Sequence, residues 1–279
     1  MIKVKMFKGW TLIPVSLALI IGTLGCFGPI IPFEQEETRT KDMSGTAIMA
    51  FSVTTSNGMV KVSTVASTLI TVVATKKSEG NTRADAETRI KCITISESVS
   101  DGVFKIETDF PNDPFGSYSV AYDITLPATL NVTLRTSNGN IEVTGIQNAV
   151  DADTSNGDIN MTTIIGSVKA DTSNGKIDLN GIQGSVDATS SNGDLDVDAI
   201  FPTDGHIIMD TSNGDIILTI LENTSAQVDA RTSNGKVTSE VAITIEGAQG
   251  ENELKGKMGG GQGTIKLTSS NGDISIKKK

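Results

Sequence analysis

The sequence predicts an all-β protein built as a β-solenoid, in which coils of about 18 residues stack on one another. Three observations predict this fold class. The triplet Ser-Asn-Gly occurs eight times, several successive copies are 18 residues apart, and apolar and polar residues alternate on both sides of each copy. A fixed period of this size is typical of repeat architectures. Strict alternation is typical of strands with one buried face.

The eight triplets have the same kinds of neighbours. Thr or Ser stands two residues before each asparagine, and apolar residues stand four before, three after and five after it, except for Ser239. The asparagines are Asn57, Asn138, Asn156, Asn174, Asn192, Asn213, Asn234 and Asn271. Each unit is therefore expected to form two short strands joined by a corner. Because Gly and Asn tolerate positive φ, Ser-Asn-Gly is expected to make that corner, with positive φ at Gly175.

A second corner is expected near "NGIQGS", where Gly181 and Gly184 flank Ile182. Four isoleucines fall eight residues after their asparagine and are expected to fill this corner: Ile146, Ile164, Ile182 and Ile200. An antiparallel meander of hairpins on two-residue Asn-Gly turns also fits the pattern. In that alternative, Thr172 would pair with Ile177.

Stacked coils would interleave charges at the position after the glycine. They would place each lysine between two aspartates, Lys176 between Asp158 and Asp194, and Lys236 between Asp215 and Asp273. Opposite charges on neighbouring strands relieve the repulsion that a row of aspartates alone would create.

The N-terminal residues 1–26 have the pattern of an export signal: Lys3, Lys5 and Lys8, then an apolar run from residue 10 to residue 24. The run ends in "TLGC", which resembles a bacterial lipobox and implies lipidation of Cys26, although Thr23 departs from the usual leucine. Alternatively, the uncharged residues 9–33 are long enough to span a bilayer as an uncleaved helix. Either reading predicts a chain that is exported and anchored to the membrane of the cell envelope.

The remaining segments are assigned in order. Residues 27–48 read as a linker, residues 49–135 as an N-terminal β part that caps the solenoid, and residues 136–279 as the solenoid repeats. Within the cap, "NTRADAETRIK" is expected to form a short helix or turn that covers the apolar end. Residues 244–263 look like a loop insertion in the last coil, and "TIKLTSSNGDISI" is expected to close the stack.

Composition excludes some functions. The formal net charge of −10 argues against nucleic-acid binding, which needs a basic surface. The chain has two cysteines, and a disulfide framework is not expected if Cys26 carries lipid. Cys92, in "RIKCITI", is expected to be a buried apolar residue.

The segment "SYSVAYDITLPATLNVTLRTSNGNIEVTG", the serial "TSNGDI" and "TSNGKI" units and the ending "TSSNGDISI" resemble the putative-adhesin family of bacterial β-strand-repeat domains of unknown function. The resemblance covers about residues 45–279. It implies a solenoid-like exported domain, for which a role in adhesion has been proposed, and it supplies no catalytic residues.

Candidate chemistry is sparse. His206 is the one histidine; a Ser-His-Asp site would need it, but it is expected to be an exposed structural residue. Asp194, Asp196 and Asp198 should point outward on one strand, with Asp178 and Asp215 on adjacent coils, an arrangement that calcium favours. The interpretation preferred here is a solvated acidic face. No catalytic, cofactor-binding or metal-binding residue is assigned, and no cofactor is expected.

The sequence thus predicts a non-enzymatic envelope protein that displays a β-solenoid as an adhesin or a binder of a surface ligand. Its partner would be a surface protein or polysaccharide, besides the membrane that holds its N-terminus. The alternatives are a self-assembling structural scaffold and, less favoured, an enzyme acting on glycans.

Overall fold

The computed structural model describes residues 30–42, 48–113, 116–200, 202–246 and 250–279. The predicted export signal, the alternative membrane helix and Cys26 lie outside these residues. Within them, no helix has the length and apolar character needed to cross a membrane.

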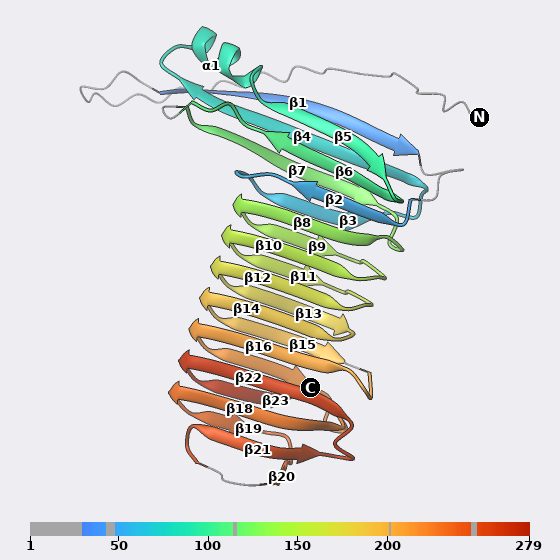
Figure 1. Cartoon of the computed structure of the whole chain (residues 1–279), viewed down its shortest axis with the longest axis vertical. Helices are drawn as coiled ribbons and strands as arrows, with labels where there is room; N and C mark the ends of the chain where they lie inside the picture. Colours follow the sequence, from blue (N-terminus) through green and yellow to red (C-terminus); the bar gives the residue numbers. More distant parts are fainter. Residues whose placement is uncertain (1–29, 43–47, 114–115, 201, 247–249) are drawn as a thin grey trace.

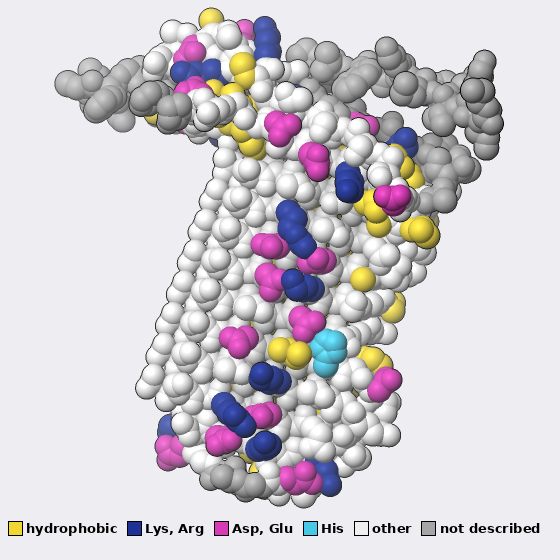
Figure 2. All heavy atoms as spheres, viewed as in Figure 1, with side chains coloured by type: hydrophobic (Ala, Val, Ile, Leu, Met, Phe, Trp, Pro, Cys, Tyr) yellow, Lys and Arg dark blue, Asp and Glu magenta, His cyan; other side chains and the backbone are white. Residues whose placement is uncertain are grey.

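Two long sheets face each other and together form a rod that widens into a head at the N-terminal end (Figure 1). The space-filling view has the same outline (Figure 2). We call the 11-stranded sheet sheet A and the 12-stranded sheet sheet B. In the rod, sheet A contains β9 (Ile141–Thr144), β11 (Ile159–Thr162), β13 (Ile177–Gln183), β15 (Leu195–Ile200) and β17 (Ile216–Ile220). Sheet B contains β8 (Asn131–Asn138), β10 (Val150–Asn156), β12 (Val168–Asn174), β14 (Val186–Asn192) and β16 (His206–Asn213).

Each coil contributes one strand to each sheet, and equivalent strands of successive coils pair in parallel and in register. Asn156 pairs with Asn138 on one side and with Asn174 on the other. Thr172 pairs with its equivalents on the neighbouring coils rather than with Ile177. The β-solenoid prediction is therefore confirmed, and the antiparallel meander is wrong.

The core lies between the two sheets and is made of the predicted inward positions. Ile146, Ile164 and Ile182 are fully buried at the second corner. Ile200 is 42% exposed, so its prediction is wrong. Because the register shifts between β13 and β15, Ala199 rather than Ile200 pairs with Ile182 and takes the buried position.

The C-terminal coil is out of chain order. Its strands β22 (Gly263–Asn271) and β23 (Ile274–Lys278) insert between β16 and β17 on one side and β18 (Ala226–Asn234) and β19 (Val237–Ser239) on the other. The expectation that this segment closes the stack is wrong. Instead β21 (Glu253–Met258) returns antiparallel along the outer edge of β18, and β20 (Thr244–Ile245) pairs with β21. The predicted loop insertion is therefore partly a pair of strands that ends sheet B.

This order also changes the charge neighbours. The coil of Lys236 lies outside the coil of Asp273, so Lys236 does not lie between Asp215 and Asp273 as predicted. Asp215 and Asp273 are instead direct neighbours. Lys176 does lie between Asp158 and Asp194, as predicted.

The head extends both sheets above the first Ser-Asn-Gly unit, which is formed by β2 (Ala50–Thr54) and β3 (Val60–Thr64). Sheet A continues with β7 (Tyr118–Leu126), β4 (Leu69–Gly80) and β1 (Ile31–Asp42); sheet B continues with β6 (Val103–Asp109) and β5 (Thr94–Ser100). The linker interpretation does not hold for β1, because all 12 of its residues pair antiparallel with β4.

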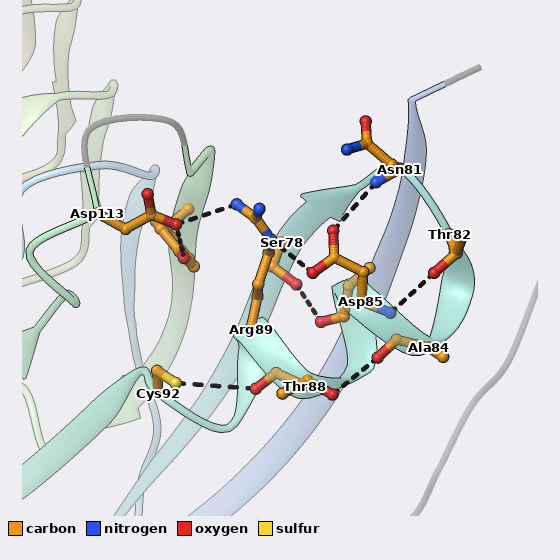
Figure 3. A network of polar contacts seen from close by, with 11 residues as sticks. Ser78, Asn81, Thr82, Ala84, Asp85, Thr88, Arg89, Cys92 and Asp113 are labelled. Atoms are coloured by element: carbon orange, nitrogen blue, oxygen red, sulfur yellow. Dashed lines mark hydrogen bonds and ion pairs between the residues drawn. The ribbon is translucent and has the colours of Figure 1, made fainter. Parts of the chain in front are cut away.

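The helix α1 (Arg83–Ile90) lies on the head, where Ala86 and Ile90 are buried. Arg89 joins it to the loop before β7: its guanidinium lies 3.0 Å from Asp85 and 3.0 Å from Asp113 (Figure 3). The hydrogen bond from Arg89 holds the pKa of Asp85 below its usual value. The segment "NTRADAETRIK", predicted to form a helix or a turn, thus contains a helix whose last turn is tied to the loop before β7.

Cys92 follows this helix in the chain and is exposed, so the prediction of a buried cysteine is wrong. The reason is local geometry. Ile90 ends the helix and Ile93 follows the turn, and both are buried, so Cys92 between them lies on the outer side of the turn. Its thiol lies 3.8 Å from the carbonyl oxygen of Thr88 (Figure 3).

Candidate binding surfaces

The Ser-Asn-Gly corners form one continuous edge of the rod. Each asparagine amide donates to the side-chain oxygen of the asparagine on the preceding coil, at 2.9 Å for Asn156, Asn174 and Asn192. The ladder runs from Asn57 to Asn234 and includes all eight asparagines. Because these amides satisfy one another, the row of asparagines along this edge is a structural device.

The buried Thr or Ser before each triplet adds a second ladder. The Thr172 hydroxyl donates to the carbonyl oxygen of Gly157 at 3.1 Å, and the equivalents on six other coils do the same. Thr55 stands on the first coil and has no triplet before it. Its hydroxyl oxygen is buried without a hydrogen-bond partner.

The glycine of the triplet is required by contact between coils. A Cβ on Gly175 would lie well under 3.0 Å from the carbonyl oxygen of Gly157, and the same clash recurs along the edge. The predicted positive φ at Gly175 is wrong. Among the triplet glycines, positive φ is found at Gly58, at 132°, and close to the extended range at Gly157 and Gly272. The left-handed conformation is instead found at the second corner, where Gly145, Thr163 and Gly181 occupy equivalent places with φ of 83°, 56° and 67°.

The acidic face predicted on sheet A exists, and its aspartates are engaged within the chain. Asp178 pairs in register with Asp196, on the next coil. Lys176 lies 3.0 Å from Asp178 and 3.9 Å from Asp196, and the hydrogen bond to Asp178 raises the pKa of Lys176. Asp198 lies 2.7 Å from the Lys279 ammonium.

Asp194 and Asp215 have a backbone role. Asp194 accepts a hydrogen bond from the backbone N–H of Asp215 at 2.9 Å, and Asp215 accepts one from Asp273 at 2.8 Å. A lysine has no acceptor to offer, so Lys176 interrupts this ladder. Among the described residues, no three His, Cys, Asp or Glu side chains come together in a group able to hold a metal ion.

Sheet B presents a different outer face, with charges of both signs in a line along the rod (Figure 2). We call the line that lies five residues before each asparagine from Asn156 onward, with its neighbour on β21, the charged row. In stack order it consists of Asp151, Lys169, Asp187, Ile208, Lys266, Asp229 and Lys255. Ile208 is 38% exposed and is the apolar member of the row.

Part of this row is paired within the chain. The Arg135 guanidinium lies 2.5 Å from Asp151, and Lys169 lies 2.7 Å from Asp171. The hydrogen bond to Asp151 raises the pKa of Arg135. Neither Lys266 nor Lys255 forms an ion pair with any residue that the structure describes. A shallow depression includes Asp151, Lys169 and Asp187 of the row, with Asn131 and Ser167 among its other lining residues.

His206, which was predicted to be exposed, lies at the edge of this face with its side chain 43% exposed. Its Nε2 is 3.2 Å from Asp187, and its backbone N–H donates to the Ser185 hydroxyl. A Ser-His-Asp site needs the serine hydroxyl on the imidazole itself. Here the serine contacts the backbone instead, so the three residues lack the arrangement of a catalytic triad.

Sequence reasoning missed the charged row as a surface. Its upper half was visible as Asp151, Lys169 and Asp187, each five residues before its asparagine. The rest of the row, Lys266, Asp229 and Lys255, depends on where the displaced C-terminal coil and β21 lie in the sheet. The periodicity of the sequence does not reveal these positions.

Comparison with known proteins gives a family and distant solved structures. The Toastrack DUF4097 family model matches residues 40–277. A putative cell adhesion protein from Clostridium sporogenes is 16% identical with a TM-score of 0.42, over 88% of this chain and 100% of its own. A putative adhesin from Bacteroides fragilis is 14% identical with a TM-score of 0.40, over 88% of this chain and 97% of its own. No curated protein matches the sequence. Because the family model matches most of the chain, the chain belongs to the Toastrack DUF4097 family.

Proposed function

We propose that this protein is a non-enzymatic adhesin of the cell envelope, which holds a rigid rod outside the membrane and binds through an outer face of the rod. One observation carries the proposal: sheet B displays six charged side chains and one isoleucine in a straight register over seven successive strands. Such a surface suits a broad contact with a large partner, whereas a small substrate needs a concave site.

Anchoring is part of the proposal. The apolar residues 10–24 precede β1 closely in the chain, so an anchor there would hold the head against the membrane and project the rod away from it. Lipidation of Cys26 would supply such an anchor, and so would an uncleaved helix.

The scaffold alternative requires ends that accept another copy. At the far end, the edge strands are β19 of three residues and β20 of two, and such short edges resist strand pairing. This observation favours binding through a face over end-to-end growth.

The experiment compares producing cells with and without the gene. Cells with the gene should expose the rod to added protease and adhere to surfaces or to one another. Deletion should reduce adherence, and the added soluble protein should compete with it. Equal adherence of both strains, with a rod that protease cannot reach, would refute the proposal. Release of the Cys26→Ser protein into the medium would identify lipid as the anchor.

A further inference from the structure

We infer that the charged row of sheet B is a homophilic interface, on which a second copy of this chain binds face to face with its rod antiparallel. This inference deepens the proposed function. The dimer itself does not depend on that function, but its role in adhesion between surfaces does. The inference starts from the order of charges along the row. At equal distances on the two sides of Ile208, the row has opposite charges, so it is complementary to a second copy of itself placed in the reverse direction.

The complementarity is visible by counting strands outward from Ile208 on β16. One strand away lie Asp187 and Lys266, on opposite sides. Two strands away lie Lys169 and Asp229. At three strands the pair is Asp151 and Lys255. At every step, an acid on one side has a base on the other.

A two-fold axis through Ile208, along the strand direction, therefore brings opposite charges together. It places Asp187 of one copy against Lys266 of the second copy, Lys169 against Asp229, and Asp151 against Lys255, each pair occurring twice. The two Ile208 side chains meet on the axis, where their exposed apolar surface is removed from water. A self-complementary patch of this kind is what an isologous dimer requires.

The unpaired cations support this arrangement. Lys266 and Lys255 have no ionic partner among the described residues of their own chain, and the second copy supplies one for each. Side-by-side parallel packing on the same row would instead oppose like charges, Asp187 against Asp187, which disfavours it.

The adjacent row, two residues further along each strand, would form both favourable and unfavourable charge pairs in this dimer. The same axis sets Asp171 against Arg231, which is favourable, and Asp153 against Glu253, which is not. Asp210 would approach its own copy near the axis. The charged row thus carries the complementarity, and this outer row limits the affinity.

The size of the face indicates a transient contact. Seven strands about 4.8 Å apart, each about 20 Å long, bury roughly 600 Å² per copy, near the lower limit for specific interfaces. A weak pair becomes effective when many copies on two surfaces engage at once. Antiparallel rods are also the orientation that two opposing anchored surfaces would present.

The test uses charge reversal, measured by analytical ultracentrifugation of residues 30–279, which contain both sheets and the whole described core. The unaltered protein should form dimers at about 10–100 µM, and added salt should weaken them. Asp187→Lys and Lys266→Asp should each weaken the dimer roughly tenfold or more. An equimolar mixture of the two variants should restore dimers, because each reversed charge then meets its opposite.

Matched controls come from the opposite face of the same coils. Asp196→Lys carries the same charge change as Asp187→Lys, and Lys277→Asp the same as Lys266→Asp, but both lie on sheet A. They should dimerise like the unaltered protein. Thermal unfolding of each variant reports its folding, and recovery in the mixture shows that both members are folded.

Three results would overturn the inference: a monomer at every concentration up to about 200 µM, single variants that dimerise normally, or a mixture that stays monomeric. Adherence that depends on the gene, combined with a strictly monomeric protein, would leave the adhesin proposal standing and remove the homophilic one. If the protein dimerises but protease cannot reach it on intact cells, the homophilic interface stands and the adhesin proposal is removed.

Discussion

At one corner of each coil the same three residues recur eight times, whereas the opposite corner varies in residue type and in length. At the uniform corner, the glycine of every triplet packs against the backbone of the neighbouring layer. There, Gly175 leaves no room for a Cβ beside Gly157. At the second corner a contact of this kind occurs only in some coils, at Gly166 and Gly184. The demand that recurs there is a left-handed φ, at Gly145, Thr163 and Gly181. Contact between coils therefore enforces repetition more strictly than chain reversal does.

The largest effect should separate the two corners directly. Gly175→Ala adds a Cβ that overlaps the carbonyl of Gly157, and should cost about 3 kcal/mol or more of unfolding free energy. Gly181→Ala, where the nearest atoms to a Cβ are 3.8 Å away and φ is +67°, should cost only about 1 kcal/mol. Urea unfolding of both variants measures the difference. Equal losses would remove the distinction between the corners.

A smaller effect should follow the position of an asparagine in its ladder. Asn174→Ala removes the amide hydrogen bonds to Asn156 and from Asn192, and should cost about 1–2 kcal/mol. Asn57→Ala, at the end of the ladder, removes one such bond and should cost about half as much. Thermal unfolding of the two variants tests the ratio. If the end variant is the more damaging one, the ladder does not act as a chain of equivalent bonds.

The buried hydroxyls give a comparison within the uniform corner. Thr172→Val removes the donor to Gly157 and should cost about 1 kcal/mol. Thr55→Val should be neutral or stabilising, since the Thr55 hydroxyl is buried without a partner and valine has almost the same shape. The denaturant midpoints of the two variants measure this difference. A large loss of stability in Thr55→Val would contradict the conclusion that the Thr55 hydroxyl has no hydrogen-bond partner.

The smallest effect should be a gain at the variable corner. Thr163 is a β-branched residue held at a φ of 56°, where its glycine equivalents are unstrained. Thr163→Gly should stabilise the fold by about 0.5 kcal/mol, because relief of strain exceeds the added freedom of the unfolded chain. We expect the melting temperature to rise. A fall would show that the backbone of Thr163 is not strained at this φ.

The periodic part of the molecule could be predicted because each inward position faces its own equivalents. Alternation around Asn156 was enough to place strands, core and stacking, and the acidic positions such as Asp196. The rest depends on contacts between segments without periodicity. The pairing of β1 with β4 is set by the head, and the place of β22 is set by β21, which takes the outer edge of β18. The charged row extends across that displaced coil, so the charge complementarity about Ile208 could not be read from the order of residues in the chain.

Because β22 and β23 lie one place inside the far end, the array of repeats can lengthen only in its interior. A duplicated 18-residue unit among the coils of Asn138 to Asn192 would add one layer of about 4.8 Å and leave the head and the β21 end as they are. The same unit added after Lys279 would meet neighbours whose strand edges are already paired. The length of the rod is therefore a property that internal duplication of the gene can adjust one layer at a time, without rebuilding either end.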